Sequence, residues 1–129
     1  MWRRHWNVTS VFHCVLCPTH ATEDWIHLFF DCNFSHRIWT YLQIDWEPAD
    51  TLEEIFITAR RKFNKPFFME IVLLAAWHIW KQRNEAIFQR ILPSFRGWRR
   101  RFIHEAYMHV HRVKDKYVTS FTSWIDSLA

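Results

Sequence analysis

The chain has 129 residues, with 17 Lys and Arg against 13 Asp and Glu, a net charge of +4 and a pI near 9.2. Half of the residues are hydrophobic and 23% are charged, which excludes a disordered chain of low hydrophobicity. One glycine and four prolines are too few turn residues for a β-rich fold, so we expect a mainly α protein.

The first element along the chain is a cluster of metal-ligand residue types, Cys14-x2-Cys17-x9-His27-x4-Cys32. These are the only cysteines, and three cysteines cannot all pair within one chain, so a disulfide framework is disfavoured. Three thiolates and an imidazole match the tetrahedral ligand set of structural zinc, with no position left for a substrate. The sequence therefore predicts a Zn²⁺ site at Cys14, Cys17, His27 and Cys32.

Two alternatives to this ligand set stay open. The cysteines could be buried apolar residues beside an incidental histidine, since free cysteine is often buried. Neighbouring histidines could also replace His27, which is preferred for its spacing alone; the rivals are His13, His20 and His36. Redox use of the Cys-x2-Cys pair would need a βαβ context, which the flanking sequence does not offer.

Short helices are predicted around the cluster. Thr22, followed by two acids, reads as one helix start, and Ser35 is predicted to cap a second helix that runs through Leu42. Residues 47–50, Glu-Pro-Ala-Asp, break the pattern. We therefore divide the chain into a zinc-binding module, residues 1–46, and a helical region with a basic C-terminal helix, residues 47–129.

Two helices are predicted next. Thr51-x-x-Glu54 matches a capping box and opens a helix that ends near Phe63, before a break at residues 64–66. A longer helix is expected from about residue 67 to residue 92. Its expected apolar stripe, spaced by three or four residues, is Met69, Leu73, Ala76, Trp77, Trp80, Asn84, Ile87, Phe88 and Ile91.

The last element is predicted to be a single helix from Phe95 to about Leu128. Its apolar stripe is close to a heptad seam and comprises Trp98, Phe102, Ala106, Val110, Val113, Tyr117, Phe121, Trp124 and Leu128. Such a seam allows self-association through the C-terminal helix.

The same segment is basic. Residues 94–118 include seven positively charged and two negatively charged side chains. A helix of this charge could lie along a phosphate backbone, although a solvated helix face is the simpler explanation because basic helix faces are common. The predicted phosphate contacts are Arg99, Arg100, Arg101, Arg112, Lys114 and Lys116.

Catalytic and targeting signals are missing from the sequence. It has no adjacent Asp pair, nucleophile elbow, phosphate-binding glycine loop or His-Glu-x-x-His motif, so we predict no enzyme activity. The N-terminus lacks the apolar core of a secretory signal, and the most apolar run, residues 66–80, is too short to span a membrane. We expect no membrane association and a reducing intracellular location, in the nucleus or the cytoplasm.

Two segments carry a family resemblance. The segment CVLCPTHATEDWIHLFFDCNFSHRIW resembles the zinc-binding domain at the C-terminal end of reverse transcriptases from plant non-LTR (LINE-type) retrotransposons. The matching positions are Cys14, Cys17, Glu23, His27-Leu28-Phe29, Cys32, Phe34-Ser35 and Trp39. A later segment, WHIWKQRNEAIF, resembles the helix that follows this domain in the family. Together the two cover roughly residues 14–92.

The resemblance implies a zinc module that contacts RNA or DNA in support of reverse transcription and is not catalytic by itself. The family carries a longer aromatic-rich stretch before the first cysteine, whereas thirteen residues precede Cys14 here. We therefore interpret the chain as a retrotransposon-derived fragment with its module truncated at the N-terminal side. The alternatives are a helical protein-interaction module and a non-functional retroelement remnant.

Overall fold

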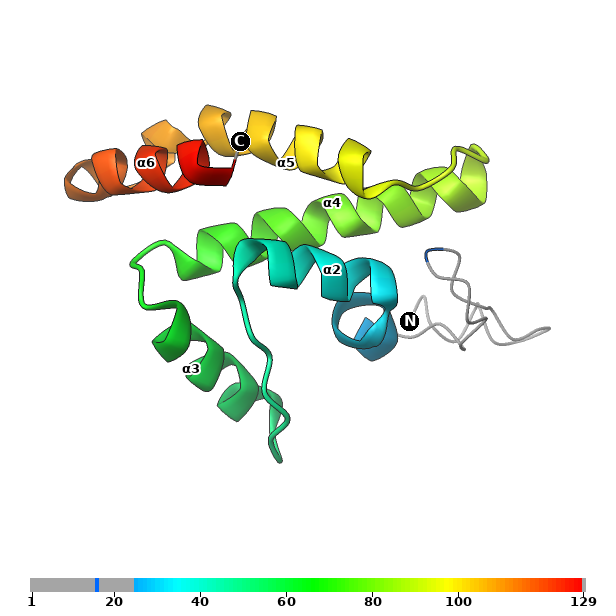
Figure 1. Ribbon diagram of the computed structural model, residues 1–129, viewed down its shortest axis with the longest axis horizontal. Coiled ribbons are helices and arrows are strands. Elements are labelled where there is room, and N and C mark those ends of the chain that lie inside the picture. The colour runs from blue at the N-terminus through cyan, green and yellow to red at the C-terminus, as the bar shows by residue number, and fades with distance from the viewer. Residues whose placement is uncertain (1–15, 17–24, 129) are drawn as a thin grey trace.

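The computed structural model describes residue 16 and residues 25–128, and within them every regular element is a helix and there is no strand (Figure 1). This confirms the prediction of a mainly α protein. In chain order the elements are the π-helical turn η1 (His27–Asp31), α2 (Asn33–Leu42), α3 (Leu52–Phe63), α4 (Phe68–Phe88), α5 (Phe95–Met108), the 3-10 turns η2 (Val110–Arg112) and η3 (Asp115–Tyr117), and α6 (Val118–Leu128).

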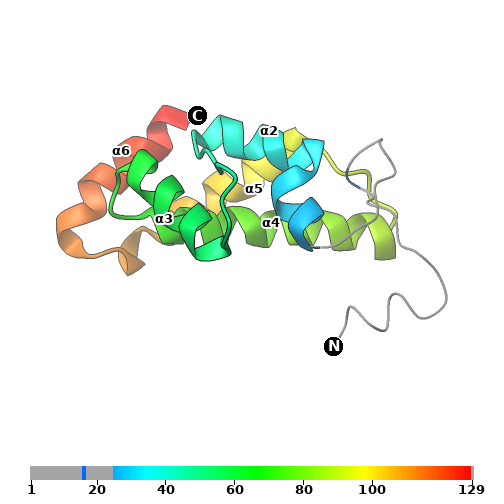
Figure 2. The same cartoon turned by 90° about the horizontal axis from the view of Figure 1, so that it is seen from below.

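Helix α4 is the centre of the arrangement. Helix α5 packs along it, α6 turns back against α5, and α2 also contacts α5 (Figures 1 and 2). Helix α3 diverges from the others, and only its C-terminal end leads into α4 (Figure 1). None of the helices in the described part of the chain is long and apolar enough to cross a membrane.

The capping box at the start of α3 is confirmed. The Thr51 hydroxyl accepts a hydrogen bond from the Glu54 N–H at 3.1 Å, and the helix ends at Phe63 as predicted. Asn64 then adopts the left-handed conformation that commonly ends a helix. By contrast, the prediction that Ser35 caps α2 is wrong, because α2 begins at Asn33 and Ser35 lies buried inside it. The predicted helix start at Thr22 lies outside the described residues.

The predicted apolar stripe of α4 is wrong, because the helix buries a different face. Leu73 is 64% exposed and Trp77 is 50% exposed. The buried apolar residues are instead Phe68, Ile71, Val72, Leu74, Ala75 and Ile79. The helix also ends at Phe88, four residues earlier than predicted, before a left-handed residue at Arg90. Apolar residues surround much of α4, so spacing alone did not identify the packed side.

The predicted single helix over residues 95–128 is also wrong. It breaks after Met108, and the chain turns through η2 and η3 before α6 runs back along α5 (Figure 1). Much of the predicted stripe is nevertheless buried, inside this chain: Trp98, Phe102, Ala106, Val113, Phe121 and Trp124. A continuous heptad seam is therefore not formed, and self-association through this segment stays a prediction.

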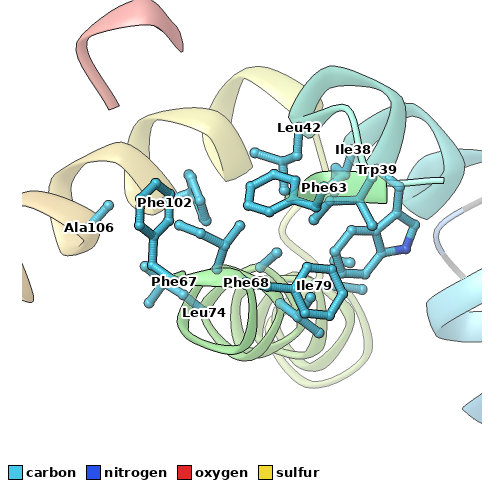
Figure 3. Close-up of a cluster of buried hydrophobic side chains, with 14 of the residues drawn as sticks. Ile38, Trp39, Leu42, Phe63, Phe67, Phe68, Leu74, Ile79, Phe102 and Ala106 are labelled. Atoms are coloured by element: carbon cyan, nitrogen blue, oxygen red, sulfur yellow. The ribbon is translucent and has the colours of Figure 1, made fainter. Parts of the chain in front are cut away.

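One core joins the early and the late helices. Side chains of α2 and α5 meet those of α4 and of the α3–α4 connection (Figure 3). Trp98 is fully buried, stacks on Phe102 with ring centroids 4.9 Å apart, and donates its indole N–H to the Ala75 carbonyl at 3.2 Å. Tyr41 of α2 donates its hydroxyl to the Leu128 carbonyl at 2.6 Å. The predicted boundary at residue 46 thus separates segments that share a core.

Candidate functional site

Two of the four predicted zinc ligands lie at either end of one wide helical turn. The Cys32 N–H donates to the His27 carbonyl at 2.7 Å, and this bond spans five residues where an α-helical bond spans four. Cys32 is extended, fully buried and directly precedes α2. The bond brings the two residues, separated by four others in sequence, to neighbouring points of the backbone.

Two side chains of α2 bind this turn. The Ser35 hydroxyl donates to the Leu28 carbonyl, and the Trp39 indole N–H donates to the Phe29 carbonyl at 2.5 Å. The two donors are one helical turn apart and so lie on one face of α2. The bonds were not anticipated from the sequence. The only indication of them in the sequence is that a serine and a tryptophan, four positions apart, follow closely after Cys32.

The remaining predicted ligands, Cys14 and Cys17, lie outside the described residues, as do the rival histidines at positions 13 and 20. His36 is described and exposed on α2. Among residues 16 and 25–128 no group of three or more His, Cys, Asp or Glu side chains could hold a metal. The described half of the predicted site nevertheless fits zinc in donor chemistry, because it pairs an imidazole with a buried thiol.

The three consecutive arginines of α5 have different surroundings. Arg99 donates to the Tyr41 hydroxyl at 3.0 Å and to the Leu128 carbonyl at 3.1 Å. Arg101 contacts both carboxylate oxygens of Glu85, at 2.9 and 2.8 Å. Arg100 is exposed. Two of the three predicted phosphate contacts on α5 are thus already engaged in holding helices together.

The other predicted phosphate contacts do not continue the α5 face. Arg112 ends η2, Lys114 lies between the two 3-10 turns, and Lys116 belongs to η3. All three are exposed. The prediction of one basic helix face is therefore wrong: the charges are divided between α5 and the turn that follows it.

A further basic hollow was missed by the sequence analysis. It lies where α3 gives way to α4 and is lined by Ile57, Arg60, Arg61, Asn64, Lys65 and Pro66, with no acidic side chain. Figures 1 and 2 both place this turn at the same end of the molecule as η2 and η3. The sequence signal was the run Arg60-Arg61-Lys62, which the negative end of the helix dipole also explains. Lys62 is distinct, because it pairs with Asp45 and Glu47 at 2.9 and 3.1 Å.

A cavity of about 510 Å³ opens between α4, α5, η2 and α6. Leu73 and Trp77 contribute exposed apolar surface to it, and Glu105 lines its polar side. Behind Glu105 lies His78, which is 2% exposed, with its Nε2 3.4 Å from the nearer carboxylate oxygen. Burial lowers the pKa of His78, and the opposing effect of Glu105 is smaller. No motif in the sequence predicts that His78 and Glu105 lie together.

Comparison with known proteins adds no relative: no protein-family model, no curated protein and no solved structure matches the chain.

Proposed function

We propose that this chain is a zinc-organised, nucleic-acid-binding module of the kind found at the C-terminal end of plant non-LTR reverse transcriptases, and that it is not catalytic on its own. The observation that carries the proposal is the π-turn η1, which joins His27 to the buried Cys32. A turn of this width is rare, and such turns occur frequently at functional sites.

The zinc site would be purely structural. Cys14, Cys17, His27 and Cys32 would fill all four positions of a tetrahedral site, so no position would remain for a water or a substrate. Three thiolates, a neutral imidazole and Zn²⁺ carry a net charge of −1, so the site itself would not attract phosphate. Contacts to nucleic acid would have to come from cationic side chains elsewhere in the chain.

Exposed cations support the nucleic-acid part of the proposal. Of the predicted contacts, Arg100, Arg112, Lys114 and Lys116 are exposed. The basic hollow of Arg60, Arg61 and Lys65 adds three more positive charges at the end of the molecule that carries η2 and η3. Such a surface contacts phosphate without reading bases, so the proposal covers RNA and DNA alike.

Metal content tests the zinc site directly. The chain purified under reducing conditions is expected to hold about one zinc, measured by elemental analysis. Cys14→Ser and Cys32→Ser should each lose the zinc. His36→Ala, which removes a rival histidine exposed on α2, should keep it. A chain without stoichiometric zinc, or cysteine variants that retain it, would refute the proposed site. If the two cysteine variants and His36→Ala all lose zinc, the imidazole ligand would be reassigned from His27 to His36.

Salt dependence tests the nucleic-acid contact. Titration of a labelled oligonucleotide at several salt concentrations should show an affinity that falls steeply as salt rises, because phosphate contact releases counterions. RNA and DNA of the same sequence are compared in parallel. An affinity that is independent of salt, or the absence of binding at low salt, contradicts this half of the proposal and leaves the zinc half standing.

A protein-interaction module is the second candidate. Helix α4 carries an exposed apolar row beside the 510 Å³ cavity, made of three residues spaced four positions apart: Met69, Leu73 and Trp77. Sedimentation at physiological salt tests it: a mass that rises with concentration, and that Leu73→Glu restores to the monomer value, would favour this function.

A further inference from the structure

We propose that Ser35 and Trp39 are positioning residues for the zinc ligands: their hydrogen bonds hold η1 as a π-turn and so set Cys32 beside His27. This inference rests on the proposed zinc site and extends it to two residues that would not touch the metal.

The turn η1 is wider than a regular α-helical turn. A regular α-helical turn would bond the Asp31 N–H to the His27 carbonyl, whereas here the Cys32 N–H makes that bond at 2.7 Å. The wider turn accommodates one extra residue and so changes the position of Cys32 relative to His27. π-helical turns are rare, so contacts from outside the turn are needed to select it.

Helix α2 supplies such contacts. Ser35 and Trp39 bond the carbonyls of Leu28 and Phe29, two consecutive residues inside η1. Both donors belong to α2, which packs against α5 and is therefore fixed by the rest of the fold. The two bonds transmit the position of α2 to the turn that carries the ligands.

Both donor residues are buried. Ser35 is fully buried and Trp39 is 3% exposed, so water cannot readily replace either donor once it is removed. The Trp39 ring also packs edge-to-face on Trp46, with centroids 5.3 Å apart. The Trp46 indole N–H is buried as well, but it has no hydrogen-bond partner in the described part of the chain.

These neighbours provide matched variants. Trp39→Phe removes an indole N–H that donates to the turn, and Trp46→Phe makes the same chemical change in the same aromatic cluster without losing such a bond. Ser35→Ala removes the second donor, and Thr40→Ala removes a hydroxyl from an exposed position of the same helix. Far-UV circular dichroism of each purified variant checks that its total helix content matches that of the natural chain.

Zinc affinity, measured by competition with a chromophoric chelator, is the first readout. Groups around a metal site that orient its ligands commonly change metal affinity 10–100-fold. Since Ser35 and Trp39 act through the backbone, we expect the lower end, about 10-fold weaker binding in Ser35→Ala and in Trp39→Phe. Thr40→Ala and Trp46→Phe should stay within about twofold of the natural chain, as expected where no such bond is lost.

The absorption spectrum of the Co²⁺-loaded chain is the second readout, because its visible bands report the geometry of the ligands at full occupancy. A role limited to general stability would weaken binding and leave the saturated spectrum unchanged. A positioning role changes the spectrum in Ser35→Ala and Trp39→Phe, but in neither control.

The outcomes separate the two proposals. If the natural chain binds no zinc, both are refuted. If the natural chain binds zinc, the positioning role is refuted by either of two results. One is that Ser35→Ala and Trp39→Phe bind zinc as tightly as Thr40→Ala and Trp46→Phe, and the other is that they have the same saturated cobalt spectrum as the natural chain. In either case the zinc site stands.

Discussion

Arg99, Arg100 and Arg101 of α5 have different surroundings, so removing the charge of each in turn compares three environments on one helix. Each is replaced by glutamine, which keeps most of the side-chain length and removes the charge. Arg100 is exposed, Arg99 joins Tyr41 to the Leu128 carbonyl, and Arg101 pairs with Glu85. The three variants should therefore differ in stability and in binding.

The stability changes follow from the contacts. Arg99→Gln loses two hydrogen bonds of 3.0 and 3.1 Å, and at roughly 0.5–1.5 kcal/mol each the net cost is about 2 kcal/mol. Arg101→Gln loses a pair whose side chains are 37% and 17% exposed, so solvent screening reduces its cost to about 1 kcal/mol. Arg100→Gln should stay within about 0.5 kcal/mol of the natural chain, as surface substitutions usually do. Urea denaturation of the zinc-loaded proteins, followed by circular dichroism, measures all three.

Binding should show the opposite order. If Arg100 contacts phosphate, Arg100→Gln weakens binding and reduces the slope of log affinity against log salt by about one. Arg99→Gln and Arg101→Gln should leave that slope nearly unchanged, because their charges are already engaged within the fold. The reasoning is refuted if all three variants lower the slope equally, or if Arg101→Gln lowers it with no loss of stability.

Three other predictions concern the fold. Thr51→Ala removes the side chain that caps α3 through the Glu54 N–H, and it should lower the free energy of unfolding by about 1 kcal/mol, measured in urea. An unchanged urea midpoint would contradict a stabilising role of this cap. Trp98→Ala should cost about 3–5 kcal/mol by the same assay, because the ring is fully buried, and a cost below about 1 kcal/mol would contradict its place in the core. Burial lowers the pKa of His78 below 6.5, so the unfolded chain binds the proton more readily and stability falls as the pH drops below about 6.5. His78→Gln should reduce that loss between about pH 7 and pH 5, and equal losses in both proteins would refute the assignment.

Local signals in the sequence predicted α3 well. Its start is set by a hydroxyl and an N–H three residues apart, and its end by Asn64-Lys65-Pro66, where Asn64 adopts a left-handed conformation. Neither signal depends on distant residues. Helix boundaries that rest on adjacent residues can therefore be predicted, and here both ends were.

Tertiary packing decided the elements that were mispredicted. Nothing near Met108 breaks a helix by composition, since residues 98–128 contain neither Gly nor Pro. The chain turns there because Phe121 and Trp124 of α6 pack on Phe67, with ring centroids 5.0 and 5.7 Å away. Distant aromatic contacts thus outweigh the local preference to continue the helix.

The candidate site divides in the same way. The spacing of His27 and Cys32 is visible in the sequence, because ligand chemistry depends on side-chain type. The hydrogen bonds of Ser35 and Trp39 are not visible, because their acceptors are backbone carbonyls, which every residue has. The pairing of Arg101 with Glu85 is hidden for another reason: fifteen residues and a turn lie between them.

The Leu128 carbonyl gives the chain an order of assembly during synthesis. It accepts hydrogen bonds from Tyr41, 87 residues earlier, and from Arg99, 29 residues earlier. Both donors are synthesised before their shared acceptor, whereas η1 and α2 lie within one short stretch of chain. The hydrogen bonds of Ser35 and Trp39 to the turn lie within residues 28–39 and can form early in translation, whereas the bonds that tie Tyr41 and Arg99 to the Leu128 carbonyl can form only after Leu128 has been added.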